Sequence, residues 1–302
     1  MFLVVLMYSI LALTFVFAKK TLAYSHPFFL IGFRMILAGT ILLAYQRFFS
    51  KSNFSINRSD YWLFFKVALF HIYFSFIFEF WSMQYLSALK ITIIYSATPF
   101  IAAILSYILL KERLSWQKIL GIIIGLGGLA PILALQAGGN GGFKEIAYIS
   151  LPECVLFLAV ISGAYAWFLV KQLMDKGYGL GMINGVAMLI GGVLSLFTCG
   201  IFEGFTNPVS NWPMFLVWLS LLILAANIIV YNFYGWLLRS YSITFITFAG
   251  FLSPTFGTVY EWIFFGGQIT WHHLASLALV ALGLYVFYRQ ELSAKDFEMT
   301  SR

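Results

Sequence analysis

The sequence predicts an all-α integral membrane protein with ten transmembrane helices, arranged as two inverted five-helix repeats. The first observation is composition: 62% of the 302 residues are hydrophobic and 10% are charged, with a mean hydropathy of +0.91. Soluble domains are about 45–50% apolar and about 25% charged. The second observation is a series of apolar runs of the length that crosses a bilayer. The third is an internal repeat offset by 155 positions, as from Trp81 to Trp236.

The repeat relates residues 81–135 to residues 236–290 without a gap. A repeat of about half the chain, in so apolar a sequence, is typical of transporters built from paired halves. Residues identical at this offset include Phe78 and Phe233, Trp81 and Trp236, Ser87 and Ser242, Thr92 and Thr247, Pro99 and Pro254, Trp116 and Trp271, and Gly128 and Gly283.

Five spans are expected in the first half, at residues 2–18, 27–45, 61–83, 91–110 and 116–135. Each is close to the ~20 residues that a bilayer requires. The first run has no basic segment before it and no small-residue cleavage site, so we expect a retained helix rather than a signal peptide. In the fifth span, Gly121 and Gly125, together with Gly127 and Gly128, predict a smooth face for close helix packing.

Five further spans are expected at residues 151–170, 179–200, 213–238, 242–264 and 271–288. Because five helices per half is an odd number, the second copy should enter the membrane upside down relative to the first. The predicted organisation is a first repeat at 1–135, a Gly-rich extracytoplasmic linker at 136–150, a second repeat at 151–290 and a cytoplasmic tail at 291–302. The linker has no Gly-Lys-Ser/Thr sequence, so it is not expected to bind phosphate.

The basic residues predict the orientation. If the N-terminus is cytoplasmic, 12 of the 18 Lys and Arg residues fall in cytoplasmic loops or the tail. Four fall outside (Lys19, Lys20, Lys90 and Lys144), and Arg34 and Lys66 lie within spans. The positive-inside rule therefore predicts that both termini are cytoplasmic. We expect a multi-pass protein of the cell inner membrane.

Polar side chains follow one stripe of the third span. His71, Ser75, Glu79 and Ser82 share a face at about 100° per residue. Ionisable groups at membrane depth are costly unless they face protein or water, so the stripe should point inward. Arg34, in the second span, is expected either to neutralise one of the acids of the outer span ends or to form a structural ion pair.

The fourth and ninth spans carry prolines at matching repeat positions, Pro99 and Pro254. Each is expected near the middle of its helix, where it would free a carbonyl one turn earlier. Such a carbonyl lines a cavity or is satisfied by protein, and a simple packing kink is the alternative. The residues expected to bind substrate are His71, Ser75, Glu79, Tyr95, Pro99, Asn227, Tyr231, Tyr234, Pro254, Thr258 and Glu261.

In this hypothesis the acids hold a cationic group and the tyrosines stack on an aromatic or sulfonium-bearing part. His71 would either couple transport to protons or donate a hydrogen bond to a neighbouring helix. We expect no metal site, no cofactor and no catalytic residue. Glu153 is interpreted as a first-turn acid favoured by the helix dipole, and His272 and His273 as part of an interfacial belt rather than a metal site.

The run SATPFIAAILSYILLKERLSWQKILGIIIGLGGL, preceded by QYLSALKIT, resembles the EamA-type transporters of the drug/metabolite transporter superfamily. The early order of Lys19 or Lys20, Pro27 and Arg34 is similar too. The resemblance implies ten helices in inverted halves, cytoplasmic termini and a central cavity open to one side at a time. One departure is the second copy of the charged turn, where Gly267 replaces the acid Glu112. Cargoes in the family include amino acids, purine compounds, sugars, drugs and S-adenosylmethionine.

The expected function is a secondary transporter of a small organic metabolite, cationic or zwitterionic, working by alternating access as an exchanger or a proton-coupled carrier. The absence of a Walker A sequence argues against ATP hydrolysis. Membrane lipid, and a proton or an exchange metabolite, are the expected partners besides the substrate; nucleic acid is not. Two alternatives are a lipid-modifying membrane enzyme that uses His71 and Glu79 as acid and base, and a broad drug or metabolite exporter.

Overall fold

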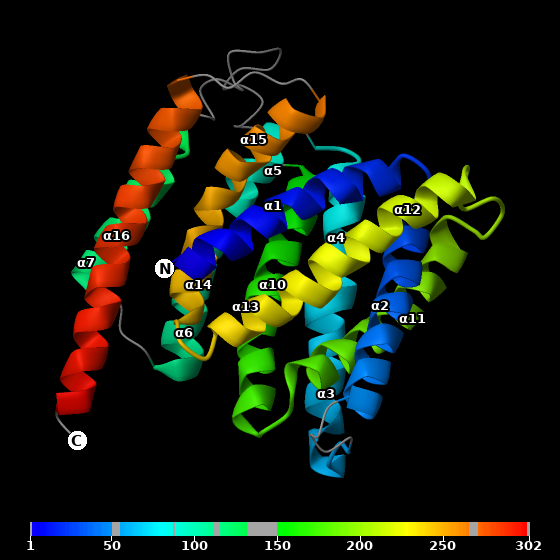
Figure 1. Ribbon diagram of the computed structural model, residues 1–302, viewed down its shortest axis with the longest axis horizontal. Helices are drawn as coiled ribbons and strands as arrows, with labels where there is room; N and C mark the ends of the chain where they lie inside the picture. The colour runs from blue at the N-terminus through cyan, green and yellow to red at the C-terminus, as the bar shows by residue number, and fades with distance from the viewer. Residues whose placement is uncertain are drawn as a thin grey trace. The chain divides into compact units, whose positions relative to one another are not determined.

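The computed structural model describes residues 2–49, 55–86, 88–111, 115–131, 150–265 and 271–300 (Figure 1). These parts are helical, and the β-type pairing among them is one isolated antiparallel bridge between Ser25 and Val209. Nine helices of the described residues are long and apolar enough to cross a membrane, and Trp116–Gly127 is a further, shorter apolar helix. The prediction of an all-α membrane protein is confirmed, while the inverted repeat stays a prediction.

The helices of the first half lie close to the predicted spans. They are α1 (Phe2–Leu22), α2 (Pro27–Phe49), the 3-10 turn η1 (Arg58–Asp60), α3 (Tyr61–Val67), the π-helical turn η2 (Ala68–Tyr73), α4 (Phe74–Met83), α5 (Ala88–Tyr95), α6 (Thr98–Leu110) and α7 (Trp116–Gly127).

The helices of the second half follow the same pattern. They are α10 (Leu151–Asp175), α11 (Leu180–Phe202), α12 (Trp212–Leu222), the π-helical turn η3 (Ile223–Val230), α13 (Tyr231–Leu237), α14 (Ile243–Ala249), the 3-10 turn η4 (Gly250–Leu252), α15 (Ser253–Phe265) and α16 (Trp271–Thr300).

Several helix ends differ from the predicted ones. Helix α1 continues past Ala18 to Leu22, so Lys19 and Lys20 lie in its last turn, where cations interact favourably with the helix dipole. Helix α16 continues past Tyr288 to Thr300. The end of the predicted fifth span, and all of the predicted linker except Ser150, lie outside the described residues.

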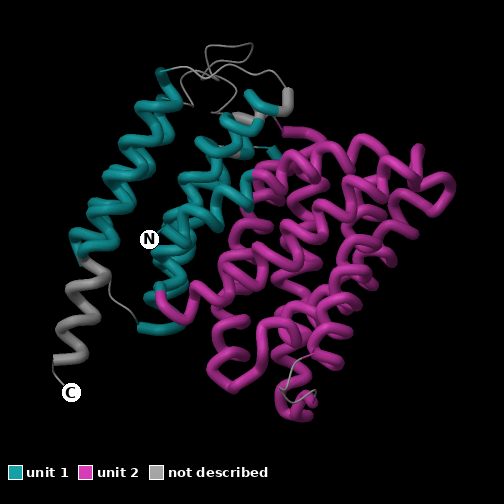
Figure 2. Tube along the Cα trace, viewed as in Figure 1, with its two compact units in different colours: residues 1–12, 87–150, 241–302 teal, residues 13–86, 151–240 magenta. Residues whose placement is uncertain are grey.

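The chain forms two compact units (Figure 2). Unit 1 comprises Met1–Ala12, Ser87–Ser150 and Tyr241–Arg302, and unit 2 comprises Leu13–Leu86 and Leu151–Ser240. Each unit takes helices from both predicted halves, so the compact units follow a different division from the sequence repeats. The division at the linker remains a prediction.

In unit 1, glycines bring α7 and α16 into close contact. A Cβ atom on Gly283 would lie 2.7 Å from the carbonyl oxygen of Gly121 and 2.7 Å from the amide nitrogen of Gly125. Both neighbours are backbone atoms, so no side-chain rotation relieves the clash. The predicted smooth face of the fifth span is thereby confirmed at Gly121 and Gly125. Gly127 is different, since a Cβ there meets nothing within 4 Å.

In unit 2, α2 and α11 form the equivalent close pair. A Cβ atom on Gly39 would lie 2.8 Å from the carbonyl oxygen of Gly185, and one on Gly192 would lie 3.1 Å from that of Gly32. Small residues let helix backbones approach closely, which supplies van der Waals contact where lipid offers no hydrophobic drive between helices. This contact holds α2, and with it Arg34, against the rest of the unit.

The first turn of α2 is capped from the far end of α11. The Glu203 carboxylate accepts hydrogen bonds from the backbone N–H of Phe28, with both oxygens at 3.0 Å, and from that of Phe29 at 3.2 Å. The first N–H groups of a helix have no partner within the helix. A carboxylate there satisfies them and interacts favourably with the helix dipole.

Removal of this cap should destabilise unit 2. We expect Glu203→Ala to lower the free energy of unfolding by about 2 kcal/mol, because the cap is made of hydrogen bonds to a charged group. Thermal unfolding of the purified protein in detergent measures the change. The control is Asp175→Asn, at an exposed acid of the same unit, which should change stability by less than about 0.5 kcal/mol. Equal effects of the two substitutions would contradict the capping role.

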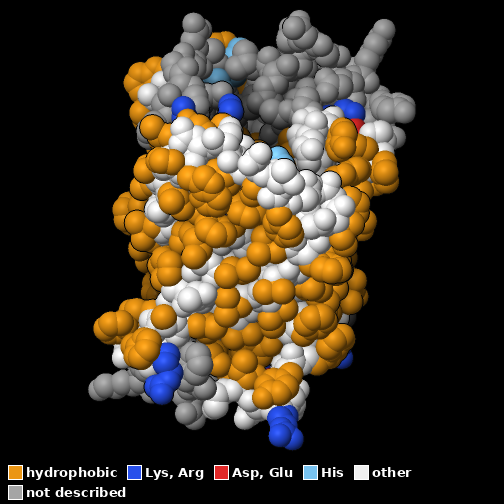
Figure 3. Space-filling model, turned by 90° about the vertical axis from the view of Figure 1, so that its right-hand side faces the viewer, with side chains coloured by type: hydrophobic (Ala, Val, Ile, Leu, Met, Phe, Trp, Pro, Cys, Tyr) orange, Lys and Arg blue, Asp and Glu red, His pale blue; other side chains and the backbone are white. Residues whose placement is uncertain are grey.

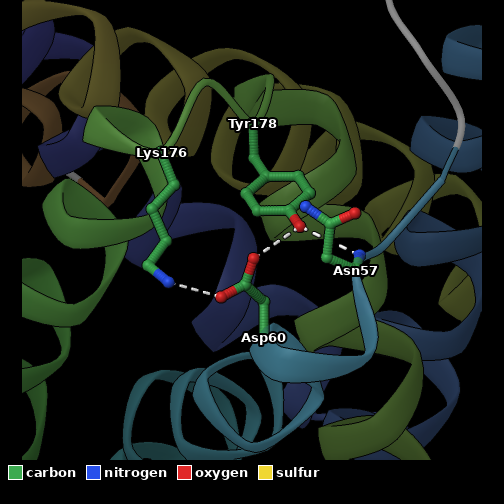
Figure 4. A network of polar contacts seen from close by, with 4 residues as sticks. All are labelled: Asn57, Asp60, Lys176 and Tyr178. Atoms are coloured by element: carbon green, nitrogen blue, oxygen red, sulfur yellow. Dashed lines mark hydrogen bonds and ion pairs between the residues drawn. The ribbon is translucent and has the colours of Figure 1, made fainter.

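A polar network joins the start of α3 to the loop between α10 and α11 (Figure 4). Asp60, which is 5% exposed at its side chain, pairs with Lys176 and accepts a hydrogen bond from the Tyr178 hydroxyl at 2.8 Å. That hydroxyl in turn accepts from the backbone N–H of Asn57 at 3.1 Å. The network holds the N-terminal end of the third span against the loop between α10 and α11.

Apolar side chains cover much of the face drawn in Figure 3, and Lys and Arg side chains lie toward its two ends. Exposed hydrophobic residues on α11 alone include Val193, Phe197 and Ile201, each more than half exposed. Exposed apolar surface of this extent is expected where side chains contact lipid rather than water.

Candidate functional site

The predicted site residues divide between the two units. Unit 1 contains Tyr95, Pro99, Pro254, Thr258 and Glu261, and unit 2 contains Arg34, His71, Ser75, Glu79, Asn227, Tyr231 and Tyr234. Within unit 2, the structure brings most of the predicted residues into one cluster.

Two π-helical turns place site residues in unit 2. His71 lies in η2 and Asn227 in η3. The turns begin at Ala68 and Ile223, which are 155 positions apart, the offset of the sequence repeat. A π-turn inserts one residue into a helix, re-aims the side chains on it, and is frequent at functional sites. The stripe predicted for the third span assumed a regular α-helix, and η2 interrupts that register.

Side chains satisfy the carbonyl groups that the wider turns leave open. Near η2, the carbonyl oxygen of Phe70 accepts hydrogen bonds from the Ser75 hydroxyl at 2.7 Å and the Ser162 hydroxyl at 2.8 Å. Near η3, the Asn232 amide donates to the carbonyl oxygen of Ile228 at 2.8 Å. Ser75 therefore supports the π-turn from which His71 projects.

Four rings from three segments form what we call the aromatic cluster: His71 of η2, Trp167 of α10, and Tyr231 and Tyr234 of α13. The His71 ring centroid lies 4.5 Å from that of Trp167 and 4.9 Å from that of Tyr231, both edge-on. The Trp167 and Tyr234 rings are stacked at 3.8 Å with an interplanar angle of 14°. Edge-to-face and stacked pairs are the favoured aromatic geometries.

His71 is 4% exposed, and its Nε2 atom has no hydrogen-bond partner among the described residues. One prediction for His71 was a hydrogen bond to a neighbouring helix. The Nε2 atom makes no such bond, and the imidazole instead packs against the rings of Trp167 on α10 and Tyr231 on α13. A buried polar atom without a partner is destabilising, and in native structures it often marks a functional group.

The charged end of the cluster is Arg34 on α2. Arg34 is 4% exposed, and its Nε donates to the Asn227 side-chain oxygen at 2.8 Å. The guanidinium carbon lies 5.2 Å from the Phe76 ring centroid, within cation–π range. The Glu79 carboxylate interacts electrostatically with Arg34. The predicted pairing of Arg34 with an acid stays a prediction, and Glu79 is an acid that acts on Arg34 electrostatically.

The positions of the two prolines correct a prediction. Pro99 and Pro254 lie in the first turns of α6 and α15 rather than in the middle of continuous helices. The fourth span breaks between α5 and α6, and the ninth contains η4 immediately before α15. Proline is tolerated in a first turn because its missing N–H would be unpaired there anyway.

The carbonyl groups one turn before the two prolines were expected to be free, but each accepts a hydrogen bond at the break in its span. The Thr98 hydroxyl donates to the carbonyl oxygen of Tyr95 at 2.5 Å, and the backbone N–H of Ser253 bonds that of Gly250. In the same unit, the Thr258 hydroxyl donates to the carbonyl oxygen of Pro254 at 3.0 Å. The side chain of Glu261 lies outside the described residues.

Glu153 and His272 are two of the residues expected to have structural roles. Glu153 lies in the first turn of α10, and the His272 ring stacks on Trp271 with centroids 3.9 Å apart. Among the residues that the structure describes, no group of three or more His, Cys, Asp or Glu side chains is arranged to hold a metal ion.

Sequence analysis missed Trp167. The available signal was its depth: Trp167 lies 16 residues beyond Leu151 and eight before Asp175 in one helix, whereas membrane tryptophans concentrate at the interfaces. A tryptophan far from both helix ends has to be explained by a partner inside the protein, which here is the stacked Tyr234 ring.

The arrangement can bind a molecule with an aromatic or sulfonium-bearing part and a charged end. Aromatic ring faces attract organic cations and stack on nucleobases, while Arg34 and Glu79 provide one cation and one anion beside them. The fold is that of a polytopic, all-helical membrane protein.

The chain belongs to the EamA-like transporter family, whose sequence profile matches residues 1–134 and 150–289. The S-adenosylmethionine/S-adenosylhomocysteine transporter of Chlamydia muridarum is 31% identical over 96% of this chain and 92% of its own length. The protein of the same name from Chlamydia trachomatis serovar L2 is 31% identical over 96% of this chain and 89% of its own. The uncharacterized transporter YetK of Bacillus subtilis is 23% identical over 68% of this chain.

A solved crystal structure shares the fold with a TM-score of 0.70, at 18% sequence identity, over 94% of this chain and 95% of that one. The protein is thus a multi-pass membrane transporter of a small metabolite, and not an enzyme. This confirms the predicted family and class, and it removes the lipid-modifying enzyme as an alternative.

Proposed function

We propose that the protein carries a sulfonium metabolite of the S-adenosylmethionine type across the cytoplasmic membrane, in exchange for its demethylated thioether or coupled to protons. The observation that carries the proposal is the aromatic cluster beside Arg34 and Glu79 in unit 2. The names of the chlamydial relatives add support from outside the structure.

Both members of such an exchange pair fit the cluster. A sulfonium cation is attracted to ring faces, and a neutral thioether sulfur also makes favourable contacts with aromatic rings. The adenine common to both stacks on tyrosine or tryptophan. A carboxylate at the sulfur position would favour only the charged member. Rings therefore suit an exchanger, which has to bind and release both.

Alternating access by two inverted halves is part of the proposal. Helices of equivalent spans pack together within each unit: α2 with α11 in unit 2 and, in unit 1, α7 with α16 and α6 of the fourth span with α14 of the ninth. Discontinuous helices, as at Pro99 and Pro254, are frequent in transporters of this design. The Lys and Arg distribution supports cytoplasmic termini.

Counterflow tests the function directly. Proteoliposomes loaded with unlabelled S-adenosylhomocysteine should accumulate labelled S-adenosylmethionine above the level reached by empty vesicles. An imposed pH gradient separates the two couplings, because only proton-coupled transport should respond to it. Absence of S-adenosylmethionine uptake, with counterflow of another class such as free amino acids or a hydrophobic drug cation, would overturn the proposed substrate.

Glu79→Gln should reduce S-adenosylmethionine uptake by about tenfold or more, because removal of the carboxylate leaves Arg34 without its negative neighbour and a cationic substrate without an anion. Initial uptake rates in proteoliposomes with matched protein content measure the effect. The matched control is Glu153→Gln, in the first turn of α10, for which we expect less than a ~2-fold change. Similar losses in both variants would remove Glu79 from the site.

A further inference from the structure

His71 keeps a polar atom that the fold does not use. The side chain is 4% exposed, and its Nε2 has no hydrogen-bond partner among the residues that the structure describes. The rings of Trp167 and Tyr231 pack edge-on against the imidazole, and both of these rings are partly exposed. A buried nitrogen without a partner is destabilising. A ligand that enters past the two outer rings would supply the missing hydrogen bond.

The imidazole is positioned by the backbone that carries it. His71 lies on the π-turn η2, and the carbonyl oxygen of the preceding residue, Phe70, accepts hydrogen bonds from two hydroxyl groups. These belong to Ser75 of the same span, at 2.7 Å, and to Ser162 of α10, at 2.8 Å. The turn is thereby tied to itself and to the helix that carries Trp167. A group that orients a ligand has to be held in this way by its surroundings.

The neighbouring helix leaves space beside the imidazole. Gly163 precedes Trp167 by one turn on α10, so the two positions share a face of that helix. Within the described parts of the chain, a Cβ atom on Gly163 would have one heavy atom of a neighbouring segment within 4 Å, the Ser75 hydroxyl oxygen at 3.4 Å. A larger side chain would occupy this space. The glycine therefore leaves room one turn away from the pair of His71 and Trp167.

Rings together with one polar atom match a nucleobase better than the sulfur of the substrate. Proteins recognise a base by stacking it on aromatic side chains and bonding the polar groups of its edge. The cluster supplies the rings, and Nε2 supplies one hydrogen-bonding atom, which donates or accepts according to the tautomer of the imidazole. A purine edge offers ring nitrogens as acceptors and, in adenine, an amino group as donor. A thioether sulfur is a weak acceptor by comparison.

We propose that His71 determines the base specificity of the transporter, with Nε2 bonded to the polar edge of the purine and the space beside Gly163 admitting the base. This inference rests on the proposed function and names the residue that recognises the adenine of the metabolite. Because His71 is enclosed, the ring of Trp167 or Tyr231 has to rotate as the base enters. A metabolite with the same sulfur and amino-acid parts but an altered purine edge should bind more weakly.

The experiment measures inhibition of labelled S-adenosylmethionine uptake into proteoliposomes by S-adenosylhomocysteine and by analogues altered only in the base. The analogues are S-inosylhomocysteine, in which an oxygen replaces the 6-amino group, and the 1-deaza, 3-deaza and 7-deaza forms of S-adenosylhomocysteine. At least one of them should require an about tenfold higher concentration for half-inhibition, because one hydrogen bond is lost. Potencies equal to that of S-adenosylhomocysteine for all four would overturn the role of His71 and leave the proposed function in place. Absence of S-adenosylmethionine transport would overturn the proposed function and this inference with it.

Variants of His71 assign the discrimination to this residue. His71→Leu removes the nitrogen at similar side-chain volume, so the ratio between the weakened analogue and S-adenosylhomocysteine should fall from about ten toward one. The unfolding temperature of the ligand-free variant should not fall, because a buried atom without a partner has been removed. A histidine with a purely structural role would give a lower unfolding temperature and an unchanged ratio. His71→Gln keeps a polar end and should retain part of the discrimination. If His71→Leu does not fold, His71→Phe, which also lacks the nitrogen, replaces it in the same comparison.

The space beside Gly163 has its own test. Gly163→Leu should lower S-adenosylmethionine uptake by about tenfold or more, because the longer side chain fills the room for the base. Gly163→Ala is the matched control, since its Cβ is in ordinary van der Waals contact at 3.4 Å, and it should change uptake by less than ~2-fold. The unfolding temperature of both variants in detergent identifies a loss caused by misfolding. Unchanged uptake by a folded Gly163→Leu variant would overturn the entry of the base at this position.

Discussion

Trp167→Ala is expected to lower S-adenosylmethionine uptake by about tenfold or more. Trp167 stacks on Tyr234 with ring centroids 3.8 Å apart and contacts His71 edge-on at 4.5 Å, so its removal opens the aromatic cluster on two sides. An aromatic surface that stacks on a nucleobase contributes about 1–3 kcal/mol, which corresponds to about 5- to 150-fold in affinity. Initial uptake rates and half-saturation concentrations in proteoliposomes measure the loss.

The matched control is Trp236→Ala. Trp236 lies on α13 with Tyr231 and Tyr234, but it is 43% exposed and contacts Phe233 rather than the cluster. We expect its replacement to change uptake by less than ~2-fold. Trp167→Phe, which restores a ring of smaller area, should recover part of the activity. If both alanine variants lost the same fraction of uptake, the loss would reflect removal of a large side chain from either helix, and the aromatic cluster would not be the substrate site.

Gly283→Ala is expected to destabilise the protein by about 1–3 kcal/mol, because overpacking at a close helix contact forces the backbones apart. The added Cβ would lie 2.7 Å from both the carbonyl oxygen of Gly121 and the amide nitrogen of Gly125. The change should appear as a lower unfolding temperature in detergent and as a lower yield of folded protein.

Gly127→Ala provides a control of opposite sign. It lies in α7, as Gly121 and Gly125 do, but its Cβ would meet nothing within 4 Å. Replacement of a helical glycine at an uncrowded position by alanine is stabilising by about 0.5–1 kcal/mol. If both substitutions moved the unfolding temperature in the same direction, the contact between α7 and α16 would not be the determinant of stability that the geometry indicates.

Sequence patterns predicted the spans well because each depends on local composition. A run of ~20 apolar residues is required for any helix that crosses a bilayer, whatever it packs against. The observed helices accordingly lie on the predicted spans, and the errors are extensions such as that of α1 to Leu22. Glycine spacing also predicted the close packing of α7, which the structure shows against α16.

Helix irregularities were not predicted correctly. Proline spacing suggested kinks in the middle of the fourth and ninth spans, but both spans break before the proline. The π-turns η2 and η3 carry no proline and left no recognised signal. Their carbonyls are satisfied by side chains such as Ser162, which lies on a different helix. A local pattern cannot report a hydrogen bond whose donor is 92 residues away in the chain.

The sequence by itself determined the fold class, the approximate bounds of the spans and the family, because apolar length is a local feature, and it proposed most residues of the candidate site from intramembrane polar positions. Only the tertiary structure decided which of those residues meet. Packing of α2 against α11, together with the register shift in η2 and η3, brings Arg34 to Asn227 and His71 to Trp167 and Tyr231. That convergence depends on contacts between segments far apart in the chain, and it turns a set of polar positions into a candidate site with an aromatic part and a charged end.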